Sequence, residues 1–591
     1  MSPDEKHNIV SYITLSEATG GRLTPGRLRD YMGRLSWEKT FLSLAVLAGS
    51  LANIRYDKGE NFASRIRTSL ERQRFHLDPD MKRIGDVVAA NPTRPIAHEQ
   101  VIYFLQAMAI LHGRADGPEP TNEQLGFLLL AANDHLRYWK EDDSPRLPEL
   151  EALVAEFCHV SRFNHHRDPI RSLVRAARIF DRKPQEGIFA DEVKWADLQR
   201  RAFGCSFVEY FESFVMPLFM VSQMWGVASA NGTFEGPIIM PEQWFSQTKL
   251  APDWASRQLQ PLSISREDAQ AELRKSLREN GLPHAPVLFV RTPFLKNAAG
   301  ALLGSSPWAV REQLRGGLWM RLMKASEKFT KRTEGWTGTF GYLFELACHE
   351  VALAAQGEPR FAGRVEVSKK PGTNELEDVV IYEGNAVILF SAKSRLVKEA
   401  VARQSVSRRA LVNWYDDFLF GAKTKTHRPG ALRLLDTRVR AIRRGDVPAA
   451  PADAQIYPVL ITFDELGENG ALYRWAEKRC REMGILQPPN VSPVTFLTLD
   501  GFEALLSLAA HGHPVASVLQ QKTAAPWANA TSDALFYNYS PDGSLLRLKV
   551  LQERFDFYAD RSHERIFGFK PTPVLMKSAE QPELPVLSET K

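Results

Sequence analysis

Residues 360–396 read RFAGRVEVSKKPGTNELEDVVIYEGNAVILFSAKSRL and decide the fold of the chain around them. Three runs in this stretch, GRVEVS, DVVIYEG and NAVILFSAK, are rich in β-branched and aromatic residues, which is typical of strands. A turn at Glu383, Gly384 and Asn385 joins the last two runs. Because AVILF is apolar at every position, we expect the third strand in the buried centre of a sheet.

The segment before these strands, Phe340 to Ala355 (FGYLFELACHEVALAA), is predicted to be a helix with apolar residues on nearly every side. Such a helix is buried, yet it carries the carboxylate of Glu345. A buried charge normally pairs, becomes neutral or binds a metal ion, because leaving it alone is costly. Glu345 therefore has two interpretations, a pairing with an arginine at a domain boundary or a functional carboxylate.

Two more charged residues lie at the ends of the predicted strands. Asp378 opens the second strand, and Lys393 closes the third strand after its apolar run has ended. A helix bearing Glu345, a hairpin bearing Asp378 and a strand ending in Lys393 resemble, in that order, the core of the PD-(D/E)XK nuclease superfamily. The resemblance extends from about Phe340 to Leu411 and departs from the family pattern at Ser391, where members usually carry Glu, Asp or Gln.

The resemblance implies a Mg²⁺ or Mn²⁺ site in a nuclease core. Asp378 would be the principal metal ligand, Glu345 a second ligand or an acceptor for metal-bound water, and the carbonyl of Ala392 a further ligand. Lys393 would orient the attacking water and stabilise negative charge on the phosphate. Serine is a poorer metal ligand than a carboxylate, so Ser391 leaves open a nuclease fold that binds without cutting.

Two glutamates precede Asp378 in the same segment. Glu377 is expected to point to the opposite face of the strand and into solvent, because successive strand residues alternate between faces. Glu375 is a fallback acid, since its loop could bring it near the site.

A basic segment follows the strands. Between Lys393 and Arg444, fourteen Lys and Arg stand against four Asp and Glu, an excess of ten, whereas the whole chain has a net charge of only +5. A helix from about Leu396 to Phe420 is predicted here, and it offers candidate nucleic-acid contacts: Lys398, Gln404, Arg408 and Arg409. By the resemblance, Gln404 corresponds to a glutamine that several branches of the superfamily place near the metal. The alternative is a solvated helix face without a ligand.

The rest of the chain predicts several further units, since 591 residues exceed one ordinary core. In residues 1–235, apolar side chains recur every three or four positions. This region is therefore expected to form a helical domain for sensing, docking or oligomerisation. A small α/β connector is expected at residues 236–330. It contains a Ser265-x-x-Asp268 capping box, which predicts the start of a helix, and a candidate strand, APVLFVRTPFL. We expect the nuclease domain at 331–525, where two more strand-helix units follow the core. Residues 526–591 predict a hairpin around Pro541, Asp542 and Gly543 and a loose tail.

Cysteine usage and hydropathy indicate the compartment. Four cysteines without a CxxC pair argue against a disulfide framework and a structural zinc site. The first residues, MSPDEKHNIVSY, lack the layout of a signal peptide. The uncharged stretch from Ser213 to Phe234 has a strongly apolar part shorter than the ~20 residues of a membrane span, so a buried helix is expected there. These features predict a cytoplasmic protein that does not span a membrane.

The expected architecture is an α-helical N-terminal half joined to a restriction-endonuclease-like α/β core, with a mixed sheet flanked by helices. The expected activity is metal-dependent endonucleolytic hydrolysis, of DNA rather than RNA, and a homo-oligomer is plausible because cutting two strands takes two sites. The architecture resembles prokaryotic anti-phage defence effectors, in which the helical half restrains the nuclease. The alternative is a catalytically inactive module that binds nucleic acid or scaffolds a protein complex.

Overall fold

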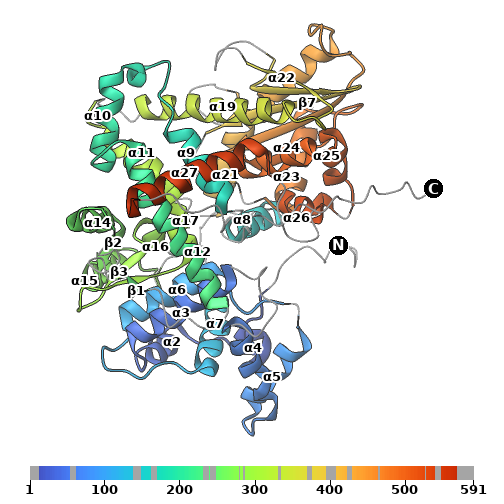
Figure 1. Ribbon diagram of the computed structural model, residues 1–591. Helices are drawn as coiled ribbons and strands as arrows, with labels where there is room; N and C mark the ends of the chain where they lie inside the picture. The colour runs from blue at the N-terminus through green and yellow to red at the C-terminus, as the bar shows by residue number, and fades with distance from the viewer. Residues whose placement is uncertain are drawn as a thin grey trace.

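The computed structural model describes residues 12–52, 62–92, 94–136, 148–161, 169–230, 238–239, 248–278, 280–283, 287–329, 334–368, 376–394, 408–421, 429–463, 466, 468–525, 527–539 and 547–568. N-terminal helices, a small sheet and a larger α/β core follow one another from the bottom to the top of Figure 1. The expectation of a helical N-terminal half and an α/β core with a mixed, helix-flanked sheet is confirmed at this level.

The N-terminal region is a bundle of helices around its own apolar cluster. Its members are α1 (Leu15–Thr19), α2 (Pro25–Met32), α3 (Trp37–Ala52), α4 (Phe62–Arg72), α5 (Pro79–Ala90), α6 (Glu99–His112) and α7 (Asn122–Leu136). Leu44, Leu70, Val88, Leu105 and Leu129 are fully buried in this cluster, each from a different helix. Helix α6 is buried on nearly every side, which makes it the centre of the bundle.

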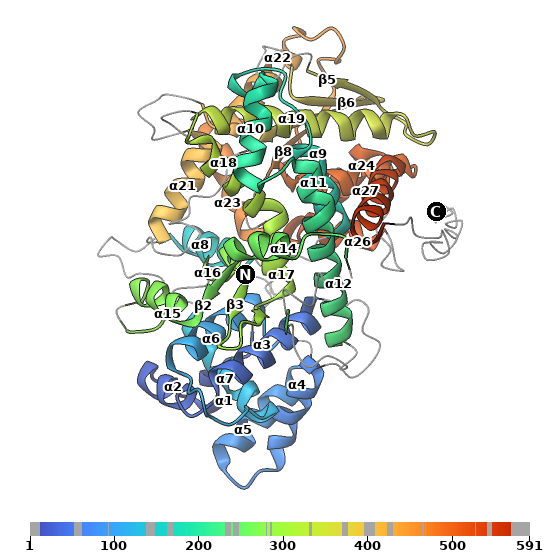
Figure 2. The ribbon, with the colours of Figure 1, turned by 60° about the vertical axis from the view of Figure 1, so that its left-hand side comes forward.

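The next helices leave this bundle and join the larger core. They are α8 (Glu149–Ser161), α9 (Pro169–Phe180), α10 (Glu192–Phe203), α11 (Phe207–Tyr210), a π-helical turn η5 (Phe211–Val215) and α12 (Met216–Ala230). Side chains of α9 to α12 belong to the same apolar cluster as the strands of the larger sheet. This cluster therefore crosses the boundary expected at residue 235, and α12 also packs against α3 of the N-terminal bundle (Figure 2).

One described helical stretch, Glu192–Trp225, is long and apolar enough to cross a membrane by length and composition. Of the most apolar window of this stretch, 56% is buried inside the structure. The π-helical turn within it is buried at all five residues, whereas Met220 and Met224 of α12 are exposed. The expectation of a buried helix from Ser213 onward is thus confirmed for most of the described part of that stretch.

A small sheet connects the two larger regions. Its strands, in spatial order, are β1 (Ile238–Ile239), β4 (Leu302–Gly304), β3 (Phe294–Lys296) and β2 (Ser263–Ser265). The helices that lie between or after these strands in the chain are α14 (Pro252–Leu259), α15 (Arg266–Lys275), α16 (Val287–Arg291), α17 (Pro307–Glu312) and α18 (Leu318–Ser326), of which α18 packs on α10 and α19. The Ser265 side chain accepts a hydrogen bond from the Asp268 backbone N–H, so Ser265 is the N-cap of α15 at the predicted place.

The strand predicted for APVLFVRTPFL is wrong over most of its length. Residues 287–291 form α16, and only the end of the run enters β3. Leu288 and Phe289 of α16 pack against Phe41 and Tyr103 of the N-terminal bundle. Because a short apolar run can be buried as a helix or as a strand, its packing partner decides which one forms.

The larger sheet has five strands in the order β5 (Arg364–Val367), β6 (Val379–Glu383), β7 (Ala386–Lys393), β8 (Gln455–Thr462) and β9 (Thr495–Thr498). Strands β5, β6 and β7 are antiparallel neighbours, whereas β7, β8 and β9 run parallel. Gly384 turns the β6–β7 hairpin with a φ of 56°, a conformation that glycine adopts readily. The three predicted strands and the central place of the third are confirmed.

Helices cover both faces of this sheet (Figure 1). The long α19 (Glu334–Gln356), α9 and α24 (Leu499–Ala510) share one apolar cluster with Val379 and Phe390. On the other face, α21 (Arg408–Phe420), α22 (Ala431–Arg443) and α23 (Gly470–Met483) share a second cluster with Val380 and Leu389, which also takes in Val154 of α8. The alternation of strand side chains thus sorts neighbouring residues into two cores.

The C-terminal part is helical, so the predicted hairpin is wrong. After α25 (Val515–Thr523) come α26 (Ser532–Asn538) and α27 (Lys549–Phe567), while Pro541, Asp542 and Gly543 lie outside the described residues. Leu551, Phe555 and Tyr558 of α27 are buried in the cluster around α19. Their spacing of four and three residues follows one face of a helix, a pattern that the strand interpretation ignored.

Candidate functional site

Asp378 and Lys393 meet where the β6–β7 hairpin opens. Asp378 immediately precedes β6, and its Oδ2 accepts a hydrogen bond of 2.7 Å from the Ala392 backbone N–H. Lys393 ends β7, and its Nζ lies 3.6 Å from the same oxygen. The antiparallel register therefore places the predicted acid and the predicted amine in contact.

Glu345 lies in the middle of α19, which packs on β7. Its Oε2 is buried and has no hydrogen-bond partner among the described residues. Burial raises the pKa of Glu345 to about 8, and the negative charge of Asp378 acts in the same direction, whereas Lys393 lowers the pKa. The three predicted catalytic groups therefore act on one another electrostatically, and two of them are in contact.

Glu377 is not a solvent residue, and that prediction is wrong. Only 7% of its side chain is exposed, and its Oε2 lies 3.8 Å from Nε of Arg438 on α22. Burial raises the pKa of Glu377 to about 7, as does Asp378, while Lys393, Ser391 and Arg438 lower the pKa. Because residue 377 precedes the first paired residue of β6, the alternation rule of strands does not govern its direction. The feature of the sequence that pointed to Glu377 and Asp378 as a pair was the occurrence of two acids directly before a strand.

The Ser-Ala-Lys run at the end of β7 is fixed by its neighbours. Ser391 has no exposed surface, and its hydroxyl lies close enough to Glu377 to lower the pKa of that acid, although it makes no hydrogen bond of good geometry with the described residues. The Ala392 carbonyl, a predicted metal ligand, accepts a hydrogen bond of 3.1 Å from Lys393 Nζ. Both backbone groups of Ala392 are thus engaged within the site.

The structure describes only two of the four residues that were predicted to contact nucleic acid. Arg408 and Arg409 open α21 and are half-buried there. Lys398, Gln404 and the fallback acid Glu375 lie outside the described residues.

The donor set limits which metal the site suits. No group of three or more His, Cys, Asp or Glu side chains that could hold a metal ion occurs in the described part of the chain. A pair of carboxylates suits Mg²⁺, which usually keeps several water ligands and takes one or two carboxylates from the protein. The buried Glu345 oxygen without a partner fits such an ion, whereas a site closed entirely by protein ligands, as in structural zinc centres, does not fit.

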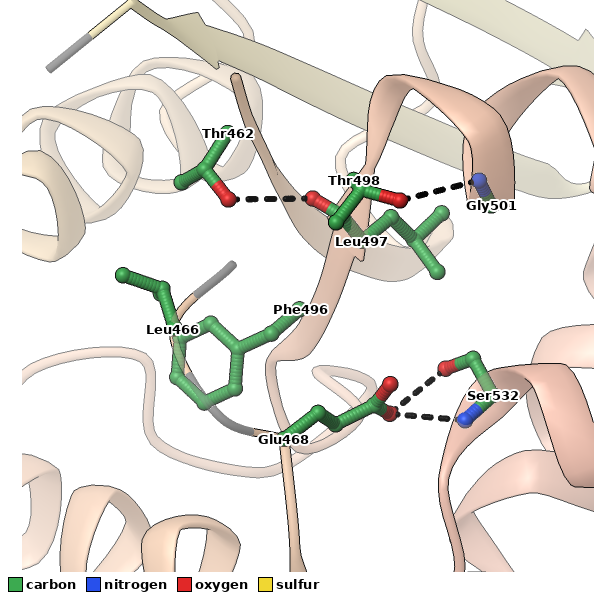
Figure 3. A pocket seen from close by; sticks show the side chains of 8 residues that line it. All are labelled: Thr462, Leu466, Glu468, Phe496, Leu497, Thr498, Gly501 and Ser532. Atoms are coloured by element: carbon green, nitrogen blue, oxygen red, sulfur yellow. Dashed lines mark hydrogen bonds between the residues drawn. The ribbon is translucent and has the colours of Figure 1, made fainter. Parts of the chain in front are cut away.

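A hollow opens beside this site at the carboxyl ends of β8 and β9 (Figure 3). Thr462 of β8 lines this hollow and pairs in register with Lys393 of β7, whereas Lys393 itself is not among the lining residues. Its lining residues are Thr462, Leu466, Glu468, Phe496, Leu497, Thr498, Gly501 and Ser532. Glu468 accepts hydrogen bonds from the Ser532 N–H at 2.9 Å and the Ser532 hydroxyl at 2.7 Å, so this carboxylate fastens the start of α26.

A buried ionic network next to α19 was not predicted from the sequence. Arg175 of α9 pairs with Asp500 of α24 at 2.7 Å, and its side chain is 1% exposed. Arg178 pairs with Glu503 of α24 at 3.3 Å and with Glu350 of α19 at 3.0 Å. Arginines at three- and four-residue spacing on α9 resemble an ordinary solvated face, and nothing local in the sequence marks them as buried.

These observations define the class of the molecule as an α/β protein with a central mixed sheet, in which Asp378 contacts Lys393 at the end of β7 and Glu345 and Glu377 interact electrostatically with both. No protein-family model, curated protein or solved structure matches the chain. The function is therefore inferred from the chemistry of this site.

Proposed function

We propose that this protein is a metal-dependent nuclease with a restriction-endonuclease-like core that hydrolyses phosphodiester bonds, in DNA rather than RNA. The observation that carries the proposal is the contact of 3.6 Å between Lys393 and Asp378 at the end of a central strand. The buried Glu345 carboxylate, without a hydrogen-bond partner among the described residues, adds a second acid to the same electrostatic environment.

Each group has a distinct part in the proposed reaction. A bound Mg²⁺ or Mn²⁺ would supply Lewis acidity and a water of lowered pKa. Asp378 would hold the cation, and its Oδ2 is already oriented by the Ala392 N–H. Glu345 would be a second ligand or accept a proton from water, and Lys393 would donate a hydrogen bond to the phosphate where negative charge develops.

The surroundings of the site favour a polyanionic substrate. The segment from Lys393 to Arg444 carries ten more basic than acidic residues, and its arginines Arg408 and Arg409 open a helix next to the sheet. Phosphate contacts of this kind supply affinity without sequence preference. Lys398 and Gln404, which lie outside the described residues, are further proposed contacts.

The biological setting is part of the proposal. We place the nuclease in the cytoplasm, as an anti-phage defence effector of a prokaryote, acting as a homo-oligomer or with a partner protein. The N-terminal helices, which have their own apolar cluster, provide a surface for such a partner.

A catalytically inactive module that binds nucleic acid or scaffolds a complex is the second candidate. Two observations favour it: Ser391 stands where a carboxylate is expected, and the described residues contain no group of three metal-binding side chains. The two candidates differ in whether a phosphodiester bond is broken.

A cleavage assay separates the two functions. Plasmid and single-stranded DNA are incubated with the full chain with and without Mg²⁺, and the wild type is compared with Asp378→Ala and Lys393→Ala. The nuclease predicts Mg²⁺-dependent cutting that falls at least ~100-fold in both variants. Binding of DNA by all three proteins, without cutting by any of them, would establish the inactive module instead.

A further inference from the structure

Glu377 is the one acid of the site that is buried against a cation of another element. Its side chain is 7% exposed and lies 3.8 Å from Arg438 on α22. Val387 and Leu389 of β7 point to the face of the sheet that α22 covers. Because side chains alternate along a strand, Ser391 points to the same face. Glu377 and Ser391 therefore approach each other from neighbouring chain segments on one face of the sheet.

The register of the hairpin explains this approach. Val379 pairs with Phe390, and the antiparallel course of β6 and β7 brings the residues before Val379 level with those after Phe390. Asp378 and Glu377 thus stand beside Ser391, Ala392 and Lys393. The Asp378 to Ala392 hydrogen bond fixes this alignment beyond the last paired residue.

Two buried oxygens of the site make no hydrogen bond of good geometry with the described residues. One is the Ser391 hydroxyl oxygen, in a side chain with no exposed surface that lies close to Glu377, and the other is Oε2 of Glu345 on α19, at the other face of the sheet. Buried polar atoms are nearly always satisfied by protein, water or an ion, so each of these oxygens would be stabilised by a further polar group at the site.

We infer that Glu377 is the second metal-binding carboxylate of the site, beside Asp378, and that it supplies the acid that position 391 lacks. This inference rests on the proposed nuclease function. Glu345 is then left to accept a hydrogen bond from a metal-bound water, and Arg438 is the counter-ion that holds Glu377 inside the protein. Two direct carboxylate ligands are compatible with the lack of any three-ligand group in the part of the chain that the structure describes.

Mn²⁺ titration and cleavage of plasmid DNA test this assignment together. The full chain is compared with Glu377→Gln, with Ser391→Glu in the Glu377→Gln background, and with the control Glu366→Gln, an exposed acid on β5 of the same sheet. We expect Glu377→Gln to weaken Mn²⁺ binding roughly 10- to 100-fold and to lower cleavage at least as much. The double variant recovers most of both, because a carboxylate returns beside Asp378, and Glu366→Gln changes neither.

Three results would overturn the inference. If Glu377→Gln binds Mn²⁺ and cuts as the wild type does, Glu377 is no ligand, although the nuclease proposal stands. If Glu377→Gln loses both properties together with a lowered melting temperature, and Ser391→Glu restores neither, Glu377 has only a structural role. If the wild type neither binds Mn²⁺ nor cuts, the nuclease proposal fails as well.

Discussion

At the scale of single residues, the acids around Lys393 differ in what stabilises their charge. Asp378 accepts a backbone hydrogen bond and contacts the lysine, and Glu377 has Arg438. Glu345 has neither kind of partner at its Oε2, so its charge is the least stabilised of the three. A protein keeps such a group where function requires it, at a cost in stability.

This cost predicts that Glu345→Gln stabilises the protein and inactivates it. The folded pKa of about 8 lies above the ordinary value of 4.5, so the folded state favours the protonated acid, and stability is lost as the pH rises from about 4.5 to 8. Above pH 8 the variant is expected to be more stable by about 1 to 3 kcal/mol, the cost of an unsatisfied buried acceptor. Thermal unfolding between pH 5 and 9 measures this difference.

The same experiment has a clear control. At pH 5 and below, the wild type and Glu345→Gln should unfold at nearly the same temperature, because both side chains are then neutral. Equal melting temperatures at pH 9, or full cleavage activity in the variant, would show that Glu345 is an ordinary surface acid.

At the scale of elements, the sequence predicted what depends on local pattern. The strands β5, β6 and β7 and the helix α19 follow from β-branched runs and from an apolar helix, and these elements bring Asp378 and Lys393 together. The α16 helix and the two C-terminal helices were misread, since short apolar runs fit either structure until a packing partner is known. Glu377 was misplaced for a related reason, because strand alternation was extended to a residue outside the strand.

The contacts between elements could not be predicted in this way. The arginines of α9 meet Asp500 and Glu503 of α24 more than 300 positions later in the chain, and only the fold brings them together. Their burial turns a common surface pattern into a fixed connection between helices on the α19 face of the sheet.

This connection predicts unequal effects for two arginines near α19. Arg175→Ala leaves Asp500 as a buried, uncompensated charge and is expected to lower the free energy of unfolding by about 3 to 5 kcal/mol. Arg182→Ala removes a half-buried arginine from Glu350, which keeps Arg178 and Arg554, and should cost about 1 kcal/mol or less. Urea unfolding of both variants measures the difference, and similar losses would contradict the buried role of Arg175.

At the scale of the whole molecule, α27 ties the C-terminal part to helices from the N-terminal half and to α19 (Figure 1). Arg565 and Arg561 both pair with Glu212 of the π-helical turn, Tyr558 donates a hydrogen bond of 2.7 Å to Asp181, and Arg554 pairs with Glu350. Residues 554, 558, 561 and 565 lie on one side of the helix, so one polar face of α27 connects these segments.

Loss of this connection should destabilise the entire core. The double variant Arg561→Ala and Arg565→Ala leaves Glu212, which is 1% exposed, without a cation, and is expected to cost about 3 to 5 kcal/mol. Adding Glu212→Gln should recover part of this loss, because no buried charge remains. Lys549→Ala, which breaks an exposed pair with Glu553 at the start of α27, serves as the control in thermal unfolding. A loss no larger than that of the control would mean that α27 is held by its apolar face alone.

The central claim is that Asp378, its neighbouring carboxylates and Lys393 enclose one divalent cation at the end of β7. Crystals of the wild type grown with Mn²⁺ test this claim through the anomalous scattering of the metal. We expect one strong peak at about 2.1 Å from a carboxylate oxygen of Asp378, within reach of Lys393 and absent in Asp378→Ala. A map without a peak at Asp378, or with the only peak elsewhere on the molecule, would contradict it.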